Sequence, residues 1–157
     1  MKTTKLILAS CLAFLLFASC KQWEVPALLI GKWESKQKVT VRTKEKGKYV
    51  FINAPDSILL QFSIDENGNV TGHLGDATLE NCKVQKNRGE FGKALNLATD
   101  YVIKGNLKGA IFSADPYLTK EISAPFYVKN NKMEGSFFQM FGLDLFPLTG
   151  MDASKKE

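Results

Sequence analysis

The sequence predicts an all-β domain: a single antiparallel β-barrel of about eight strands, with a β-sandwich as the alternative. Apolar and polar residues alternate along several short segments, of which residues 58–64 are the clearest. This period of two is typical of strands. Turn-forming residues separate these segments, and helix-forming patterns are few. Many short strands in one chain of 157 residues favour a closed barrel or a sandwich.

The first 19 residues have the features of a secretory signal. Lys2 and Lys5 are followed by a mainly apolar run of 12 residues, 6–17, and then by two small residues. The apolar run is too short to span a bilayer as a helix. A basic start, a short apolar stretch and small residues before a cleavage point are typical of a signal peptide. We therefore predict a signal peptide over residues 1–19.

The residues that follow the apolar run, Phe17-Ala18-Ser19-Cys20, resemble the lipobox of bacterial lipoproteins. In that family the cysteine is acylated and becomes the new N-terminus, although Leu is preferred where Phe17 stands. The resemblance implies lipid attachment at Cys20, and two or more acyl chains anchor a protein stably. Lys21 stands where an Asp would favour retention in the inner membrane, and the resemblance therefore implies the outer membrane of a Gram-negative envelope. No acidic run follows Cys20 to suggest export to the cell surface, so we expect a domain that faces the periplasm. The alternative is a secreted protein with an incidental cysteine.

A basic first strand is predicted over residues 32–48, which contain seven basic and two acidic residues, a net charge of +5. The basic residues fall on even positions, whereas Trp33, Val39 and Val41 fall on odd ones. Strand geometry therefore places the basic side chains on one face, at least to about Thr43. This face is either a contact for phosphate-rich lipid or an acidic partner, or a solvated surface whose lysines discourage aggregation.

The later elements follow from the same alternation and from turn chemistry. Asp65-Glu66-Asn67-Gly68-Asn69 is a turn sequence, because Asn and Gly tolerate positive φ. Asn130-Asn131 is the turn of a second hairpin. The predicted strands are 58–64, 70–74, 78–84, 99–107, 126–128, 133–138 and 140–148, with one short helical turn near 89–95.

Charge and cysteine content limit the possible functions. The chain from Cys20 onward has a net charge of +3, which is too mild to indicate nucleic-acid binding. Cys82 is then the only cysteine besides Cys20, so no disulfide can form between two cysteines of the folded domain. The chain divides into a signal peptide (1–19), a lipidated tether (20–29), one β domain (30–150) and a polar tail (151–157).

Two short motifs resemble those of lipocalins. Gly31-Lys32-Trp33 at the start of the first strand resembles the first lipocalin motif, and Thr99-Asp100-Tyr101 resembles the second, in the same order along the chain. Leu29 stands where lipocalins have Asn. The arginine that lipocalins carry near the end of the domain, where it packs on the Trp, has no counterpart in this chain. The resemblance covers residues 30 to about 148 and implies a lipocalin-like (calycin-type) barrel in which Trp33 has a structural role at one end. Small envelope lipoproteins with such a first strand mostly have no assigned function.

A ligand site, if present, would combine apolar and aromatic residues with a few polar groups. Arg88 lies in a cationic loop with two glycines that could hold a carboxylate or phosphate. Arg88, Tyr101 and Phe137 are therefore the candidate ligand-binding residues. The alternatives are a solvated turn for Arg88 and core packing for the apolar run that contains Phe137.

We find no signature of catalysis, of a metal site or of a cofactor. His73 is the only histidine, and on the predicted strand it points away from the core. Cys82 is expected to be a buried small apolar residue. A structural metal site needs several His or Cys ligands, which this pair does not supply.

Two functional hypotheses follow. The leading hypothesis is an outer-membrane lipoprotein that binds a small apolar or amphipathic ligand inside its barrel. The alternative is a non-catalytic accessory subunit of an envelope complex, with a barrel filled by side chains. Its working surface would be the basic first strand or the apolar C-terminal segment. A hydrolase is disfavoured because no acid–base pair is recognisable.

Overall fold

The computed structural model describes residues 23–89, 99–142 and 144–156. All regular structure within these ranges is β, and it forms ten strands. The strands are β1 (Gly31–Gln37), β2 (Thr40–Glu45), β3 (Lys48–Asn53), β4 (Ile58–Ile64), β5 (Asn69–Leu74), β6 (Ala77–Lys86), β7 (Tyr101–Lys108), β8 (Thr119–Lys129), β9 (Lys132–Phe141) and β10 (Asp144–Lys156).

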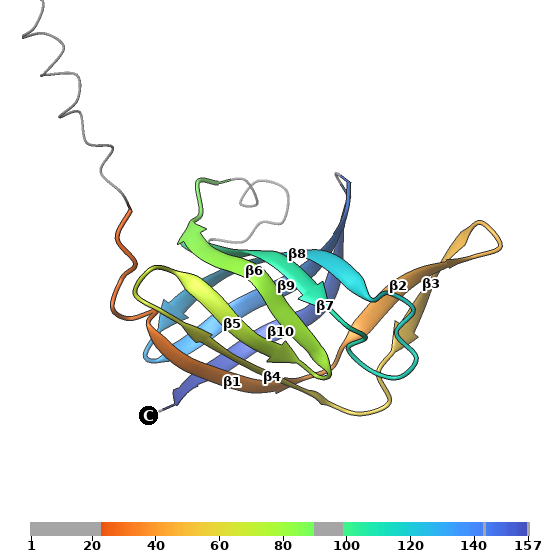
Figure 1. Cartoon of the computed structure of the whole chain (residues 1–157), viewed down its shortest axis with the longest axis horizontal. Helices are drawn as coiled ribbons and strands as arrows, with labels where there is room; N and C mark the ends of the chain where they lie inside the picture. Colours follow the sequence, from red (N-terminus) through yellow and green to blue (C-terminus); the bar gives the residue numbers. More distant parts are fainter. Residues whose placement is uncertain (1–22, 90–98, 143, 157) are drawn as a thin grey trace, which may run out of the picture.

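Eight of these strands close into one antiparallel barrel, in the order β1-β10-β9-β8-β7-β6-β5-β4 (Figure 1). From β4 to β10 each strand pairs with the next one along the chain, and β1 closes the barrel between β10 and β4. The prediction of an all-β barrel of about eight strands is confirmed, and closure excludes the sandwich. An eight-stranded antiparallel barrel is consistent with a calycin-like fold.

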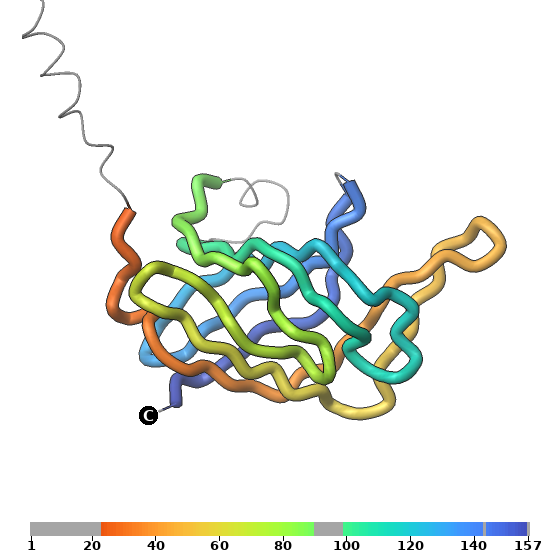
Figure 2. The backbone as a smooth tube through the Cα atoms, in the orientation of Figure 1, coloured from red at the N-terminus to blue at the C-terminus, as the bar shows by residue number. Residues whose placement is uncertain are grey.

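β2 and β3 form a separate two-stranded hairpin, inserted in the chain between β1 and β4. The hairpin projects from one end of the barrel, which we call the hairpin end (Figure 2). Residues 23–30 lie at the opposite end, which we call the N-terminal end, together with the end of β10 (Figure 1). The chain therefore enters the domain at one end and presents its only strands outside the barrel, within the described ranges, at the other.

The single basic strand predicted over 32–48 is wrong, because the chain forms two strands there and begins a third. β1 ends at Gln37, β2 runs over Thr40–Glu45, and Lys46 and Gly47 make a two-residue turn into β3. Both turn residues have positive φ, 47° and 80°, as in the tight turns that suit hairpins. The predicted alternation itself survives the break, since Val39 and Val41 are both buried.

The polar tail predicted over 151–157 is also wrong for residues 151–156, which belong to β10. Met151 and Ala153 are buried and pair with Gly135 and Met133 of β9. The polar residues between them form the outward half of a barrel strand, which composition alone does not distinguish from a tail. The helical turn expected near 89–95 lies almost wholly outside the described residues.

Part of the predicted tether packs against the barrel. Leu29 is fully buried, and its carbonyl accepts a hydrogen bond from the indole N–H of Trp33 at 2.9 Å. Trp23 and Val25 pack against the hydrophobic core at the same end. Residues 23–29 are therefore part of the domain, and residues 20–22 lie outside the described ranges.

A small β-barrel is a fold that could hold a ligand, but the inside of this barrel is filled by side chains. Trp33, Phe126 and Phe137 have no exposed surface, and Phe62 has only 2%. A side chain that lines an empty cavity of ligand size has free surface within that cavity, and these four have almost none. The packing is completed by buried aliphatic residues, which include Leu60, Leu74, Ile103, Leu107, Ile122 and Met133.

Glycines on the strands make room for the aromatic rings. Gly135 pairs with Phe126, and Gly72 pairs with Phe62. A Cβ at Gly135 would overlap the backbone oxygen of Pro125 and crowd the Cβ of Phe126. Each ring therefore occupies space that a larger residue on the neighbouring strand would take.

We expect Gly135→Ala to lower the free energy of unfolding by about 1–3 kcal/mol, because overpacking forces strands apart. Urea unfolding followed by tryptophan fluorescence measures this change. Gly150→Ala is the matched control on β10, where the nearest atom to a new Cβ is the side-chain oxygen of Gln37 at 3.4 Å. Equal losses in the two variants would contradict a filled interior.

The loop 109–118 covers the hairpin end and is held by a buried ion pair. The Nζ of Lys120 lies 2.5 Å from the Oδ2 of Asp115, and both side chains are fully buried. Lys120 also donates to the backbone carbonyl of Tyr117 at 2.6 Å. Asp115 accepts the backbone N–H groups of Ile111 and Tyr117. Burial lowers the pKa of Lys120, and the hydrogen bond and charge of Asp115 oppose that shift.

Candidate binding surface

The two faces of the β2–β3 hairpin differ in chemistry. Val41 pairs with Ile52, and both pack against the hydrophobic core. The residues that alternate with them form the opposite face, where Arg42 pairs with Phe51 and Lys44 pairs with Tyr49. The hairpin is therefore attached through its apolar face and presents a face that is both cationic and aromatic.

The guanidinium of Arg42 is held between two aromatic rings. Its Cζ lies 3.3 Å from the ring centroid of Tyr49 on β3 and 3.4 Å from that of Phe146 on β10. Both distances are well within the range of a cation–π contact. Because Phe146 belongs to a barrel strand, this stack also joins the hairpin to the barrel.

Arg42 has no acidic partner among the described residues. The ion pairs of the structure join other groups, and the Nε of Arg42 is buried without a hydrogen-bond acceptor within the described ranges. The nearby turn adds further positive charge, because Lys46 and Lys48 are both exposed. The hairpin surface is therefore positive, because Glu45 alone offsets the charges of its four basic residues.

The aromatic residues of this surface are unusually exposed. Tyr49 is 51% exposed and Phe51 is 57% exposed. We call Arg42, Lys44, Tyr49, Phe51 and Phe146 the cationic–aromatic face. Large exposed apolar side chains that lie together mark interaction sites more often than isolated ones do.

Ring contacts extend the cationic–aromatic face across the hairpin end. Phe146 contacts Phe141 of β9 at 5.6 Å between centroids, and Phe141 contacts Tyr117 at 5.6 Å. The basic first strand and the apolar C-terminal segment were separate candidate surfaces on the sequence. The structure brings them together through Arg42 and Phe146.

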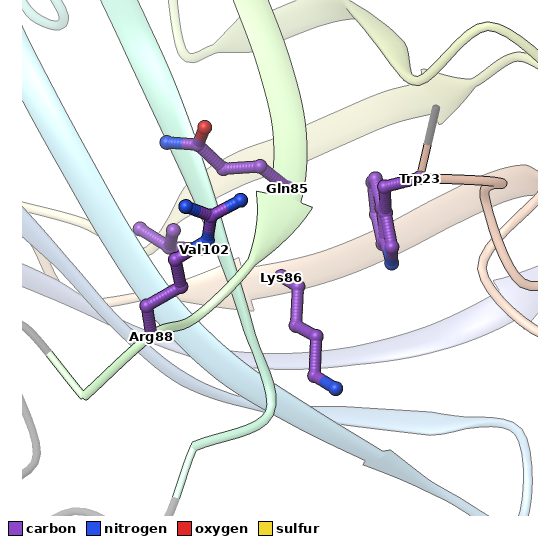
Figure 3. A pocket seen from close by; sticks show the side chains of 5 residues that line it. All are labelled: Trp23, Gln85, Lys86, Arg88 and Val102. Carbon is purple, nitrogen blue, oxygen red and sulfur yellow. The ribbon is translucent and has the colours of Figure 1, made fainter. Parts of the chain in front are cut away.

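A pocket of about 380 Å³ opens at the N-terminal end (Figure 3). Its lining includes Trp23, Gln85, Lys86, Arg88 and Val102. Figure 3 shows the indole of Trp23 across the pocket from Gln85 and Arg88. Two cations and an indole at an open pocket could attract an anionic group.

The three predicted ligand residues lie in different environments. Arg88 lines the pocket at the N-terminal end. Tyr101 lies next to this pocket, with its ring 6.5 Å from that of Trp23 and 5.6 Å from that of Phe126. Phe137 is fully buried among the interior side chains. The structure therefore groups Arg88 with Tyr101 and separates Phe137 from both.

His73 and Cys82 do not form a pair. His73 lies beside Gln61, with 3.2 Å between its Nε2 and the Gln61 Oε1. Cys82 is 3% exposed and belongs to the hydrophobic core. Burial raises the pKa of its thiol, which makes it a poorer nucleophile. Within the described part of the chain, no three His, Cys, Asp or Glu side chains gather in a way that could hold a metal ion.

Two features of the folded domain were not predicted from the sequence. The first is the stack of Arg42 on Phe146, which are too far apart in the sequence for any local pattern to reveal. The second is Lys120, whose signal was present: it shares the inward alternation of Ile122, Ala124 and Phe126. A lysine in an apolar alternation indicates a buried charge and hence a buried partner.

Comparison of the chain with protein-family models, with curated proteins and with solved structures found no match. No helix within the described residues is both long and apolar enough to cross a membrane. The function must therefore be inferred from the surfaces described above.

Proposed function

We propose that this protein is a non-catalytic lipoprotein, anchored in the outer membrane through Cys20, whose filled barrel presents a binding surface to an envelope partner. Of the two functional hypotheses, the filled interior favours the accessory role over a ligand inside the barrel. The lipocalin-like motifs fit this view as parts of a stable scaffold: Trp33 packs inside the barrel at the N-terminal end, and Tyr101 begins β7 at the same end.

The cationic–aromatic face carries this proposal. It combines exposed rings of Tyr49 and Phe51 with the clamped guanidinium of Arg42, which lacks an acid partner within the described residues. Interfaces are enriched in Tyr, Phe and Arg, and binding energy concentrates at such residues. A solvated face that only prevents aggregation has no need of exposed aromatic rings.

The position of the hairpin agrees with this role. Trp23 is three residue steps along the chain from Cys20, which allows a reach of about 10 Å at about 3.4 Å per residue. A lipid at Cys20 would therefore hold the N-terminal end near the membrane. The hairpin, at the other end of the barrel (Figure 1), would point away from that membrane and into the periplasm.

We expect a photo-crosslinking amino acid in place of Tyr49 to give a discrete protein adduct in intact cells. The cells are those of the Gram-negative bacterium that naturally makes this protein, so that its partner is present. The same amino acid at Thr71, which is exposed on β5, is the control and should give none. Immunoblotting of the irradiated cells against the protein detects the adduct as a shifted band.

Absence of the adduct together with a bound small molecule would support the ligand-binding hypothesis instead. Native mass spectrometry of the purified full chain can find a bound mass of a few hundred daltons that is lost on denaturation. Such a mass, sensitive to Arg88→Ala and accompanied by no adduct at Tyr49, would contradict the proposed function. It would place the ligand at the pocket that Arg88 and Trp23 line.

A further inference from the structure

β3 has a free backbone edge. It pairs with β2 along one side, and no other strand within the described ranges pairs with it. Because an unpaired strand edge presents a row of N–H and C=O groups, it can accept an extended segment as an additional strand. Each barrel strand, in contrast, has a hydrogen-bonded neighbouring strand on both sides along at least part of its length.

The side chains beside this edge define what an added strand would meet. Tyr49 and Phe51 both lie on the cationic–aromatic face, because one residue separates them along β3. In a paired strand, side chains directly opposite lie about 5 Å away on the same face. An added segment would therefore set apolar side chains against these two exposed rings.

The charge around the edge selects the segment. Residues 40–53 contain four basic residues and one acidic residue, a net charge of +3. Arg42, Lys44, Lys46 and Lys48 are the basic residues, and Glu45 is the acidic one. Carboxylates on the added strand would balance this excess of positive charge, because opposite charges across an interface favour association.

Two other occupants fit less well. A second copy of this chain would bring two hairpins of charge +3 edge to edge, which like-charge repulsion disfavours. Residues 23–30 lie at the end of the barrel opposite the hairpin (Figure 2), so a membrane that held a lipid at Cys20 would lie away from β3. This second argument depends on the lipid anchor of the proposed function.

We propose that the free edge of β3 binds an extended, acidic segment of another protein, which adds to the hairpin as a third strand and covers Tyr49 and Phe51. This inference rests on the proposed function and specifies the chemistry of the partner.

The probe is an eight-residue peptide that repeats Glu-Glu-Val-Val, so that each face of the strand carries both carboxylates and apolar groups. Two controls accompany it: a Lys-Lys-Val-Val peptide, and a Glu-Glu-Val-Val peptide with alternate backbone nitrogens methylated. Binding to the full chain in mild detergent is measured by calorimetry. Hydrogen exchange then locates the amides that become protected.

We expect binding of the acidic peptide only, with protection confined to residues 48–53. Lys46→Glu with Lys48→Glu reverses two exposed charges at the hairpin turn, and it should weaken binding at least about ten-fold. Lys129→Glu with Lys132→Glu is the matched control, because these exposed residues flank the β8–β9 turn at the N-terminal end. It should bind as the parent does.

Three results would overturn the inference: equal binding of the Lys peptide, equal binding of the methylated peptide, or no binding of the acidic peptide. A fourth result concerns the full chain inserted in phosphatidylglycerol vesicles. If the vesicles protect residues 48–53 from hydrogen exchange and the peptide does not, the hairpin binds a lipid surface instead.

If the adduct at Tyr49 persists but the peptide does not bind, only the acidic segment is refuted. Loss of the adduct would instead refute the proposed function.

Discussion

Asp115→Ala is expected to destabilise the barrel by about 3–5 kcal/mol, because it leaves the buried ammonium of Lys120 without its counter-ion. Typical domains have a total stability of about 5–15 kcal/mol, so this loss is a large part of it. Asp115 also accepts two backbone N–H groups of the loop 109–118. We therefore expect the covering of the hairpin end to loosen first.

The control is the double variant Asp115→Leu with Lys120→Met. It removes both charges together, and replacing a buried pair by apolar groups costs far less than breaking it. Urea unfolding of the parent, the single variant and the double variant gives the three free energies. A single variant no less stable than the double variant would show that the pair is not buried in solution.

The same pair gives stability a pH dependence. Burial lowers the pKa of Lys120 in the folded state, and Asp115 opposes this only in part. Between the lowered pKa and the ordinary value of 10.5, the unfolded chain binds the proton that the folded chain has lost. The contribution of Lys120 to stability therefore rises as pH rises through that window. The rise should be absent from the double variant.

Cys20→Ser is expected to move the protein almost completely from the membrane to the soluble fraction. Stable anchoring depends on the acyl chains, at about 0.8 kcal/mol per buried CH₂, and serine has no thiol to carry them. The measurement is fractionation of cells labelled with a radioactive fatty acid. The parent should be labelled and sediment with membranes, and the variant should be neither.

Cys11→Ser is the matched control, since it changes the other cysteine that precedes the domain. It should keep both the label and the membrane location. If the label persists in Cys20→Ser, the lipid is attached elsewhere. If neither protein is labelled, the chain is secreted or held by other means, and the orientation argued for the hairpin no longer applies.

The strands themselves could be predicted from the sequence because alternation is a local property. β4 matches the predicted 58–64, and the turns at 65–69 and 130–131 lie between the strands that they were expected to join. The inward positions of Trp33, Val39 and Val41 also follow from alternation alone. An all-β barrel could be predicted because such strands, without helices to cover them, can bury their apolar faces only against one another.

Tertiary structure alone decided the candidate surface. Arg42 meets Phe146 only because barrel closure places β10 beside the base of the hairpin, where Val39 bridges to Thr149. Residues 151–156 resemble a polar tail in composition, but residues 151–154 pair with β9 and residues 154–156 pair with β1. Whether the barrel holds a ligand or side chains was equally hidden, since it depends on how rings such as Phe126 fit against Gly135. Local pattern fixes which residues turn inward, but the partner that each one meets is set by contacts between distant parts of the chain.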